Sequence, residues 1–222
     1  MPRESTNLPE YWDSYKPHRG EGDQPAPEVD RFAWTQYDGH GPGAEFLGAP
    51  RTALELGCAE GGEAVYLARS GVAVTALDFS TAQIARARNW WGGTPGLTFA
   101  HAEACDYLTS SPATYDAIFS IWGAVWFTDP DDLIPLVAER LEPGGVLAFS
   151  QAEPIEDYYG PQPMYGNGLA GRKLTLLRWA YSPQWWADLL KRTGFTDIDA
   201  TILPAPDPDD VGTLMVRARR AG

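Results

Sequence analysis

A loop of small residues between two apolar runs is the stretch of this chain best suited to bind a ligand. The run Ala53–Leu56 ends at Gly57, and Ala59 and Gly61 follow before a segment with helical apolar periodicity begins. This order is typical of a buried strand, a tight turn and a helix whose N-terminus faces a ligand. A second apolar run ends at Asp78, where nucleotide-binding α/β proteins hold the ribose hydroxyls. Together the two runs predict a nucleoside-binding pocket.

The residue types in the loop discriminate between ligands. A pyrophosphate needs glycine where this chain has Ala59. The Gly-Lys-Ser/Thr sequence of a P-loop and the Tyr-x-x-x-Lys pair of short-chain dehydrogenases are both absent. Glu55, inside the first strand, favours a ligand that is cationic and carries no phosphate. S-adenosylmethionine (SAM), with its ammonium and sulfonium groups, meets that description.

At these residues the chain resembles the class I SAM-dependent methyltransferases. The first motif of that family, acid-x-Gly-x-Gly-x-Gly, is matched by Glu55–Gly61, with alanine at the middle glycine. The resemblance continues at Asp78–Phe79, at Ala102–Ala104, where Glu103 replaces the usual aspartate, and at the turn Leu141–Leu147. It covers roughly residues 50–150 and is specific as a set, whereas the glycine loop alone is a weak signal.

The resemblance implies a role for each matched residue. The loop would hold the methionine part of SAM, Asp78 the ribose, and Phe79 one side of the adenine. Glu103 would accept a hydrogen bond from the adenine amine, although an acid at a helix N-terminus also has a purely structural explanation. The expected cofactor-binding residues are Glu55, Gly57, Ala59, Gly61, Asp78, Phe79, Glu103, Ala104, Ile121 and Trp122.

Aromatic side chains are the main clue to the methyl acceptor. If they converge, they form a box that binds an aromatic or cationic small molecule; the alternative is ordinary core and lid packing. The expected substrate-binding residues are Trp34, Tyr37, Trp126, Tyr158, Tyr165 and Trp179.

No residue stands out as a catalytic base, and His101 and His40 are only weak candidates. Methyl transfer to an amine depends mainly on alignment and exclusion of water. We therefore expect N-methylation ahead of O-methylation of a small aromatic hydroxyl or a carboxylate. The alternatives are a protein or peptide substrate, a SAM-binding module without catalysis, and an NAD-dependent oxidoreductase.

Alternating strand-like and helix-like segments surround these motifs. The expected strands are 52–56, 72–77, 97–101, 115–120, 146–150, 195–203 and 211–219. They predict an α/β, Rossmann-like, mostly parallel seven-stranded sheet with helices on both faces and an antiparallel C-terminal edge hairpin. Residues 151–181 break this order, and we expect a structureless aromatic lid there.

The chain divides into an N-terminal segment, 1–50, and a methyltransferase domain, 51–222, that carries the lid. The aromatic N-terminal segment packs either at the mouth of the cleft, which it would cover, or on the outside of the core.

Charge and composition narrow the partners. The net charge of −13 argues against nucleic acid. No apolar run approaches the roughly 20 residues of a membrane span. The polar N-terminus lacks the apolar region of a signal peptide, so we expect a cytoplasmic location. Cys58 and Cys105 have no metal-ligand spacing, and we expect free buried thiols and no metal.

Overall fold

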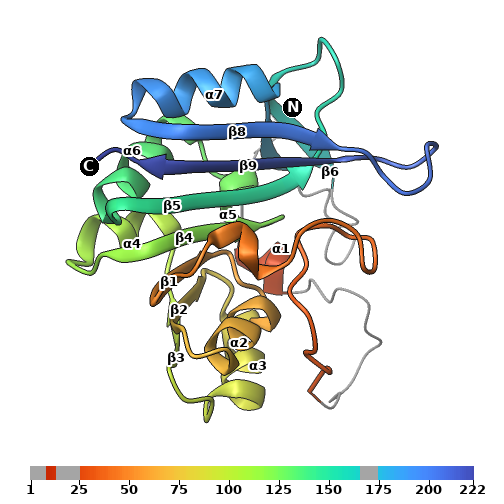
Figure 1. Ribbon diagram of the computed structural model, residues 1–222. Coiled ribbons are helices and arrows are strands. Elements are labelled where there is room, and N and C mark those ends of the chain that lie inside the picture. Colours follow the sequence, from red (N-terminus) through yellow and green to blue (C-terminus); the bar gives the residue numbers. More distant parts are fainter. Residues whose placement is uncertain (1–8, 14–25, 166–174) are drawn as a thin grey trace.

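A seven-stranded sheet forms the centre of the computed structural model, which describes residues 9–13, 26–165 and 175–222 (Figure 1). The strand order is β3-β2-β1-β4-β5-β9-β8. The strands are β1 Thr52–Leu56, β2 Ala73–Asp78, β3 Leu97–His101, β4 Tyr115–Ile121, β5 Leu141–Ala152, β8 Phe195–Leu203 and β9 Thr213–Arg220. Strands β1 to β5 pair in parallel, and β9 is antiparallel to both β5 and β8. The predicted fold class is confirmed, with β9 lying between β5 and the edge strand β8.

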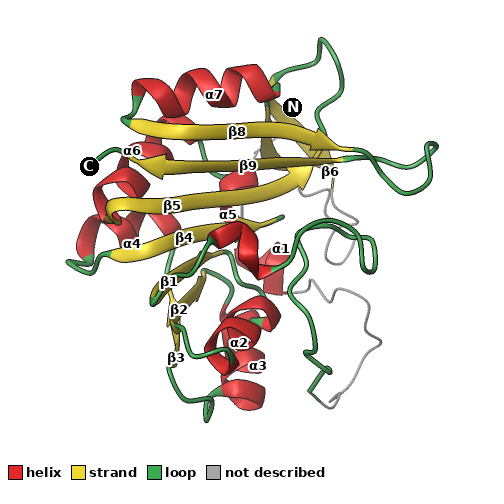
Figure 2. Ribbon diagram, viewed as in Figure 1, coloured by secondary structure: helices red, strands yellow, loops and turns green. Residues whose placement is uncertain are grey.

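Helices cover both faces of this sheet (Figure 2). The helices are α1 Pro9–Asp13, α2 Gly62–Arg69, α3 Thr81–Trp91, α4 Ala104–Ser110, α5 Ala124–Phe127, α6 Pro130–Arg140 and α7 Pro183–Arg192, with a 3-10 helix, η1, at Ala44–Leu47. Buried side chains of α4, α6 and α7 pack with Leu54 and Leu56 of β1. Those of α2 and α3 pack with Ala53 on the other face. Within the described ranges, no helix is long and apolar enough to cross a membrane.

Residues 32–47, ahead of β1, pack against the core on the α2–α3 side of the sheet. Phe32, Trp34 and Leu47 are buried in the same cluster as α2 and α3. The indole of Trp34 is fully buried, and its Nε1 donates a hydrogen bond to the Gly43 carbonyl at 3.0 Å. Of the two placements considered for the aromatic N-terminal segment, this part adopts the outer one.

The insert between β5 and α7 contains a β-hairpin, so the expectation of a structureless lid is wrong. Strands β6, Gly160–Tyr165, and β7, Thr175–Ala180, pair antiparallel as a separate two-stranded sheet. Strand β6 was not predicted because it contains Pro161 and Pro163, and proline argues against a central strand. Both strands of a two-stranded sheet are edges, where proline is tolerated.

Candidate functional site

A cavity of about 690 Å³ lies at the carboxyl ends of the parallel strands, within the usual range for small-molecule sites. Residues from the loops after β1 to β4, from α1, α3 and α5, and from the β6–β7 hairpin line it. Its walls include Gly57, Ala59, Asp78, Phe79, Gln83, Glu103, Ala104, Ile121, Trp122, Trp126, Phe127, Asp129, Asp132, Met164 and Trp179, together with Tyr11 and Trp12.

The loop after β1 brings its backbone against the loop after β4. Gly57 has φ +78°, and a Cβ there would lie 2.5 Å from the backbone nitrogen of Ala124. Ala59 also has a positive φ, +45°, a conformation that favours glycine. Gly61 does not line the cavity; it caps α2 at φ +80°, and a Cβ there would meet the Phe99 ring at 2.6 Å.

Asp78, at the end of β2, has a carboxylate oriented by the backbone. Its Oδ2 accepts from the Ala59 N–H and its Oδ1 from the Ser80 N–H, each at 2.9 Å. Burial raises the pKa of Asp78, and the nearby Asp13 carboxylate raises it further, while the two backbone N–H groups oppose that shift. The carboxylate lines the cavity and keeps lone pairs for hydroxyl donors.

Phe79, Glu103 and Ala104 line the same part of the cavity. Glu103 is the N-cap of α4, and its Oε2 accepts from the Asp106 N–H at 3.0 Å. Glu103 therefore has the structural role of capping α4. Because it also lies in the cavity wall, its other carboxylate oxygen is available to a ligand.

Glu55 lies beneath the loop and does not line the cavity. Its side chain is only 2% exposed, and its Oε2 has no hydrogen-bond partner among the described residues. Burial raises the pKa of Glu55 well above its ordinary value of 4.5, and the Glu63 carboxylate adds to that rise. A hydrogen bond from the Ala64 N–H acts in the opposite direction, so Glu55 supports the start of α2 from below.

Aromatic rings from three elements gather on the other side of the cavity. Trp122, with φ +49°, lies 5.5 Å from Trp126 in a perpendicular arrangement. Phe127 packs against Trp126 at 5.1 Å, and Trp179 of β7 completes this wall. The rings of Trp122, Trp126 and Phe127 follow β4, as expected for Trp122 and Trp126, and Ile121 lies beside them.

Other residues expected at the acceptor or as bases lie away from the cavity. Trp34 belongs to the core, and its carbonyl accepts from Trp122 Nε1 at 3.2 Å. The Tyr37 hydroxyl donates to the Val211 carbonyl at 2.7 Å, and His40 Nε2 contacts the Pro204 carbonyl at 2.8 Å, so both pack on the β8–β9 loop. These contacts correct the expectation that Trp34 and Tyr37 surround the acceptor, and they place His40, a weak candidate for a base, away from the cavity.

Tyr158 and His101 also point elsewhere. Tyr158 is 55% exposed at the surface of the insert and does not line the cavity. His101 Nε2 contacts the Phe79 carbonyl at 3.0 Å and likewise lies outside the lining. The side chain of Tyr165 lies outside the described residues.

Several residues of the cavity wall were not among the expected site residues. Tyr11 and Trp12 reach the cavity from α1, and Gln83 from α3. Asp129 and Asp132, at the start of α6, add two carboxylates. Among the described lining residues there is no lysine, arginine or histidine, so the wall is both acidic and aromatic. A short aromatic stretch ahead of the core was the one available sign of α1.

Comparison with known proteins gives matches centred on the same region. Residues 53–145 match the family model described as a methyltransferase domain. Trans-aconitate 2-methyltransferase of Methylobacterium radiotolerans is 32% identical over 123 residues, which are 52% of this chain and 45% of that protein. Ubiquinone biosynthesis O-methyltransferase of Paracidovorax citrulli is 28% identical over 102 residues, 45% of this chain and 43% of that protein. The chain thus spans less than half the length of the curated relatives it matches.

Among solved structures, the chain is similar to phosphoethanolamine N-methyltransferase 2 of Haemonchus contortus in complex with SAM. The TM-score is 0.62 at 17% identity, and the match covers 80% of this chain and 51% of that chain. At this identity the likeness concerns the fold. The loop after β1, the ordered Asp78 carboxylate and the size of the cavity are compatible with an adenosyl ligand.

Proposed function

We propose that this chain, whose residues 53–145 match a methyltransferase domain, is a SAM-dependent methyltransferase that transfers the methyl group of SAM to an amine nitrogen of a small molecule. The observation that carries the proposal is the composition of the cavity wall. Carboxylates and aromatic rings line it, and no basic side chain is present among the described lining residues. Such a wall favours a cationic ligand over an anionic one.

The donor half of the cavity has groups suited to each part of SAM. The Asp78 carboxylate would accept hydrogen bonds from the ribose hydroxyls, and Phe79 would cover the adenine. Glu103 has an oxygen left for the adenine amine. The loop around Gly57 and Ala59 would hold the methionine part, with Trp122 beside it. SAM supplies a methyl group already activated by its sulfonium, so the protein needs to align the acceptor and exclude water.

The acceptor half supports an amine. Phe127 and Trp179 offer ring faces, and each cation–π contact contributes about 0.5–2 kcal/mol. One face of Trp126 is already covered by the Arg178 guanidinium, 5.4 Å from the ring centroid. Asp129 and Asp132 add negative charge to the wall. An amine can lose its proton to solvent before the transfer. Methylation of an amine therefore does not require a histidine base, and none is present among the described lining residues.

The donor is tested by calorimetry with S-adenosylhomocysteine (SAH), the demethylated product. We expect the wild-type protein to bind SAH and Asp78→Ala to lose at least about tenfold in affinity, or about 1.4 kcal/mol. Asp188→Ala, which removes an exposed acid on α7, is the matched control and should leave affinity unchanged. Absence of SAH binding to the wild-type protein, or an unchanged affinity in Asp78→Ala, would refute the donor assignment.

The acceptor atom is tested with SAM carrying an isotopic methyl group. Matched small aromatic and aliphatic amines, hydroxyls and carboxylic acids are incubated with the protein, and the products are identified by mass spectrometry. We expect label on amine nitrogen, with a rate that rises with pH as the free amine forms. Label found only on oxygen would establish O-methylation instead. SAH binding with no transfer to any acceptor would favour a binding module.

A further inference from the structure

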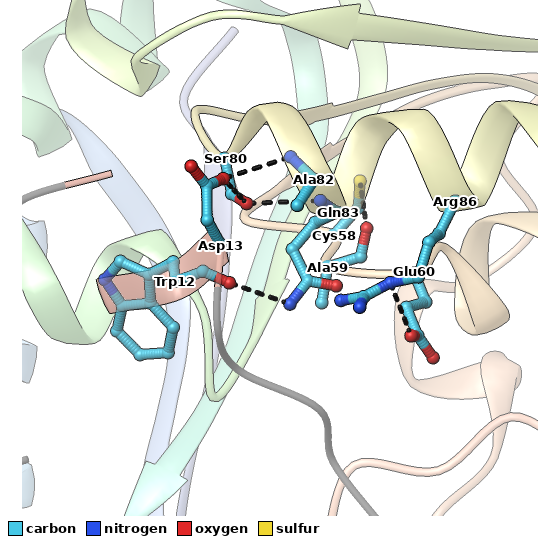
Figure 3. A network of polar contacts seen from close by, with 9 residues as sticks. All are labelled: Trp12, Asp13, Cys58, Ala59, Glu60, Ser80, Ala82, Gln83 and Arg86. Carbon is cyan, nitrogen blue, oxygen red and sulfur yellow. Dashed lines mark hydrogen bonds and ion pairs between the residues drawn. The ribbon is translucent and has the colours of Figure 1, made fainter. Parts of the chain in front are cut away.

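The Asp13 carboxylate attaches helix α1 to the start of α3. Asp13 Oδ1 accepts from the Ser80 hydroxyl at 2.6 Å and from the Ala82 N–H at 3.0 Å (Figure 3). The Ala82 N–H belongs to the first turn of α3, where no partner within the helix exists. A residue distant in the chain therefore completes the N-terminus of a helix that begins beside Asp78.

The cap of α3 shows how α1 fits into it. Ser80 and Gln83 have capping-box spacing, and the Ser80 hydroxyl does accept from the Gln83 N–H at 3.1 Å. In a complete box the Gln83 side chain would return to the Ser80 N–H. That N–H donates to Asp78 instead, and Gln83 Nε2 donates to the Trp12 carbonyl at 3.0 Å. Both Ser80 and Gln83 are buried, so these bonds form away from water.

Trp12 joins the two sides of the cavity. Its carbonyl is held by α3, while its indole packs against Phe127 of α5 with centroids 4.8 Å apart and ring planes at 69°. Figure 3 shows the indole turned away from α3, on the side opposite Gln83. Tyr11 lies edge-on to Trp12 at 5.1 Å, and both rings line the cavity. Helix α1 thus spans from the element after β2 to the element after β4.

We propose that Asp13 is a positioning residue that holds α1 across the cavity and so makes Tyr11 and Trp12 part of the binding site for the adenosyl ligand. A helix of five residues has no stability of its own in water, so its place depends on these contacts. The contacts meet α3 beside Asp78 and Phe79, the residues proposed to hold the ribose and adenine. The inference rests on the donor half of the proposed function and on no particular acceptor.

The test uses the full chain and the rate at which bound SAH dissociates. Asp13→Ala is expected to speed dissociation about tenfold, because the hydrogen bonds that hold α1 are lost. Asp13→Asn keeps an oxygen at Oδ1 and is expected to stay within about twofold of the wild-type rate. Ser182→Ala removes the hydroxyl that caps α7 by accepting from the Trp185 N–H, and it serves as the matched control for loss of a cap. It should leave SAH dissociation unchanged.

A double-variant cycle distinguishes positioning from general weakening. If Asp13 acts through Trp12, then Asp13→Ala combined with Trp12→Ala should dissociate SAH no faster than Trp12→Ala alone. Multiplication of the two effects would overturn the inference, as would an Asp13→Ala rate within twofold of wild type. Wild-type protein that binds no SAH would refute the donor assignment. If the wild-type protein binds SAH and Asp13→Ala releases it at the wild-type rate, only the role of Asp13 is refuted.

A second readout needs neither ligand nor transfer. Hydrogen exchange of the Ala82 amide, measured by NMR in ligand-free protein, should become faster in Asp13→Ala because its acceptor is gone. The Gln83 amide, which donates to Ser80, is the internal reference and should keep its protection. Unchanged protection of Ala82 would overturn the attachment itself.

Discussion

Gly57 and Gly144 have nearly the same positive φ and different surroundings. Their φ values are +78° and +76°. A Cβ on Gly57 would lie 2.5 Å from the Ala124 nitrogen, whereas a Cβ on Gly144 would have nothing within 4 Å. The pair therefore separates the cost of a positive φ from the cost of close backbone approach.

We predict that Gly57→Ala destabilises the protein more than Gly144→Ala. Both should lose about 1–2 kcal/mol from the positive φ. Gly57→Ala should lose a further 1–3 kcal/mol or so, because its Cβ forces apart the loops after β1 and β4. Urea unfolding of the two variants measures the difference. Equal losses would show that the close approach carries no energetic weight.

Ala59 shows what a sequence can and cannot reveal at the scale of one residue. The departure from glycine was visible, and so was the retention of a small side chain. In the structure Ala59 has φ +45° and directs its N–H at Asp78, and the residue type specifies neither feature. The burial of Glu55 could not be predicted either, because the sequence places this residue in a strand but does not specify the direction of its side chain.

At the scale of elements, local signals predicted well. The Ser80 cap, the proline after Asp129 and the glycine after α2 all lie at helix ends as expected. Each depends on neighbours within about four residues, so the sequence carries the whole signal. The placement of the aromatic N-terminal residues depends on distant contacts. As a result, Trp34 packs in the core while Trp12 reaches the cavity, and composition alone could not separate them.

The β6–β7 hairpin gives a prediction for acceptor binding. Trp179 lines the cavity, whereas Tyr158, from the same insert, is exposed at the surface. We expect Trp179→Ala to raise the KM for an amine acceptor about 2- to 30-fold, the range for loss of one cation–π contact. SAH affinity should change little. Tyr158→Ala is the matched control; a KM that rises equally in both variants would contradict the placement of Trp179 at the acceptor.

At the scale of the molecule, the sequence predicted the donor half of the site better than the acceptor half. The donor half is built from loops at the ends of consecutive parallel strands, so strand alternation and a few motifs were enough to assemble it. The match to a methyltransferase domain over residues 53–145 confirms the resemblance in that region. The acceptor half joins α5 and the hairpin, which no local pattern brings together.

Some of the acids of this acidic chain are buried near the donor loop. The chain has a net charge of −13 at pH 7. Three acids near the donor loop, Glu55, Glu63 and Asp78, have pKa values raised mainly by burial. Each binds a proton more tightly in the folded protein than in the unfolded chain. Their contribution to stability is therefore complete below the unfolded pKa and is lost as pH rises through the higher folded pKa.

We predict that the free energy of unfolding falls as pH rises above about 4.5, and that Glu55→Gln makes this fall less steep. One such group changes the slope by at most about 1.4 kcal/mol per pH unit. Urea unfolding between pH 5 and 8 measures the slope, with Glu156→Gln, an exposed acid, as the matched control. Stability can depend on pH through repulsion between surface charges as well as through the buried acids. Repeating the series in about 1 M salt separates these two causes, because salt screens surface repulsion and leaves the buried acids almost unaffected. If Glu55→Gln and Glu156→Gln give the same slope in high salt, the pH dependence does not originate at Glu55.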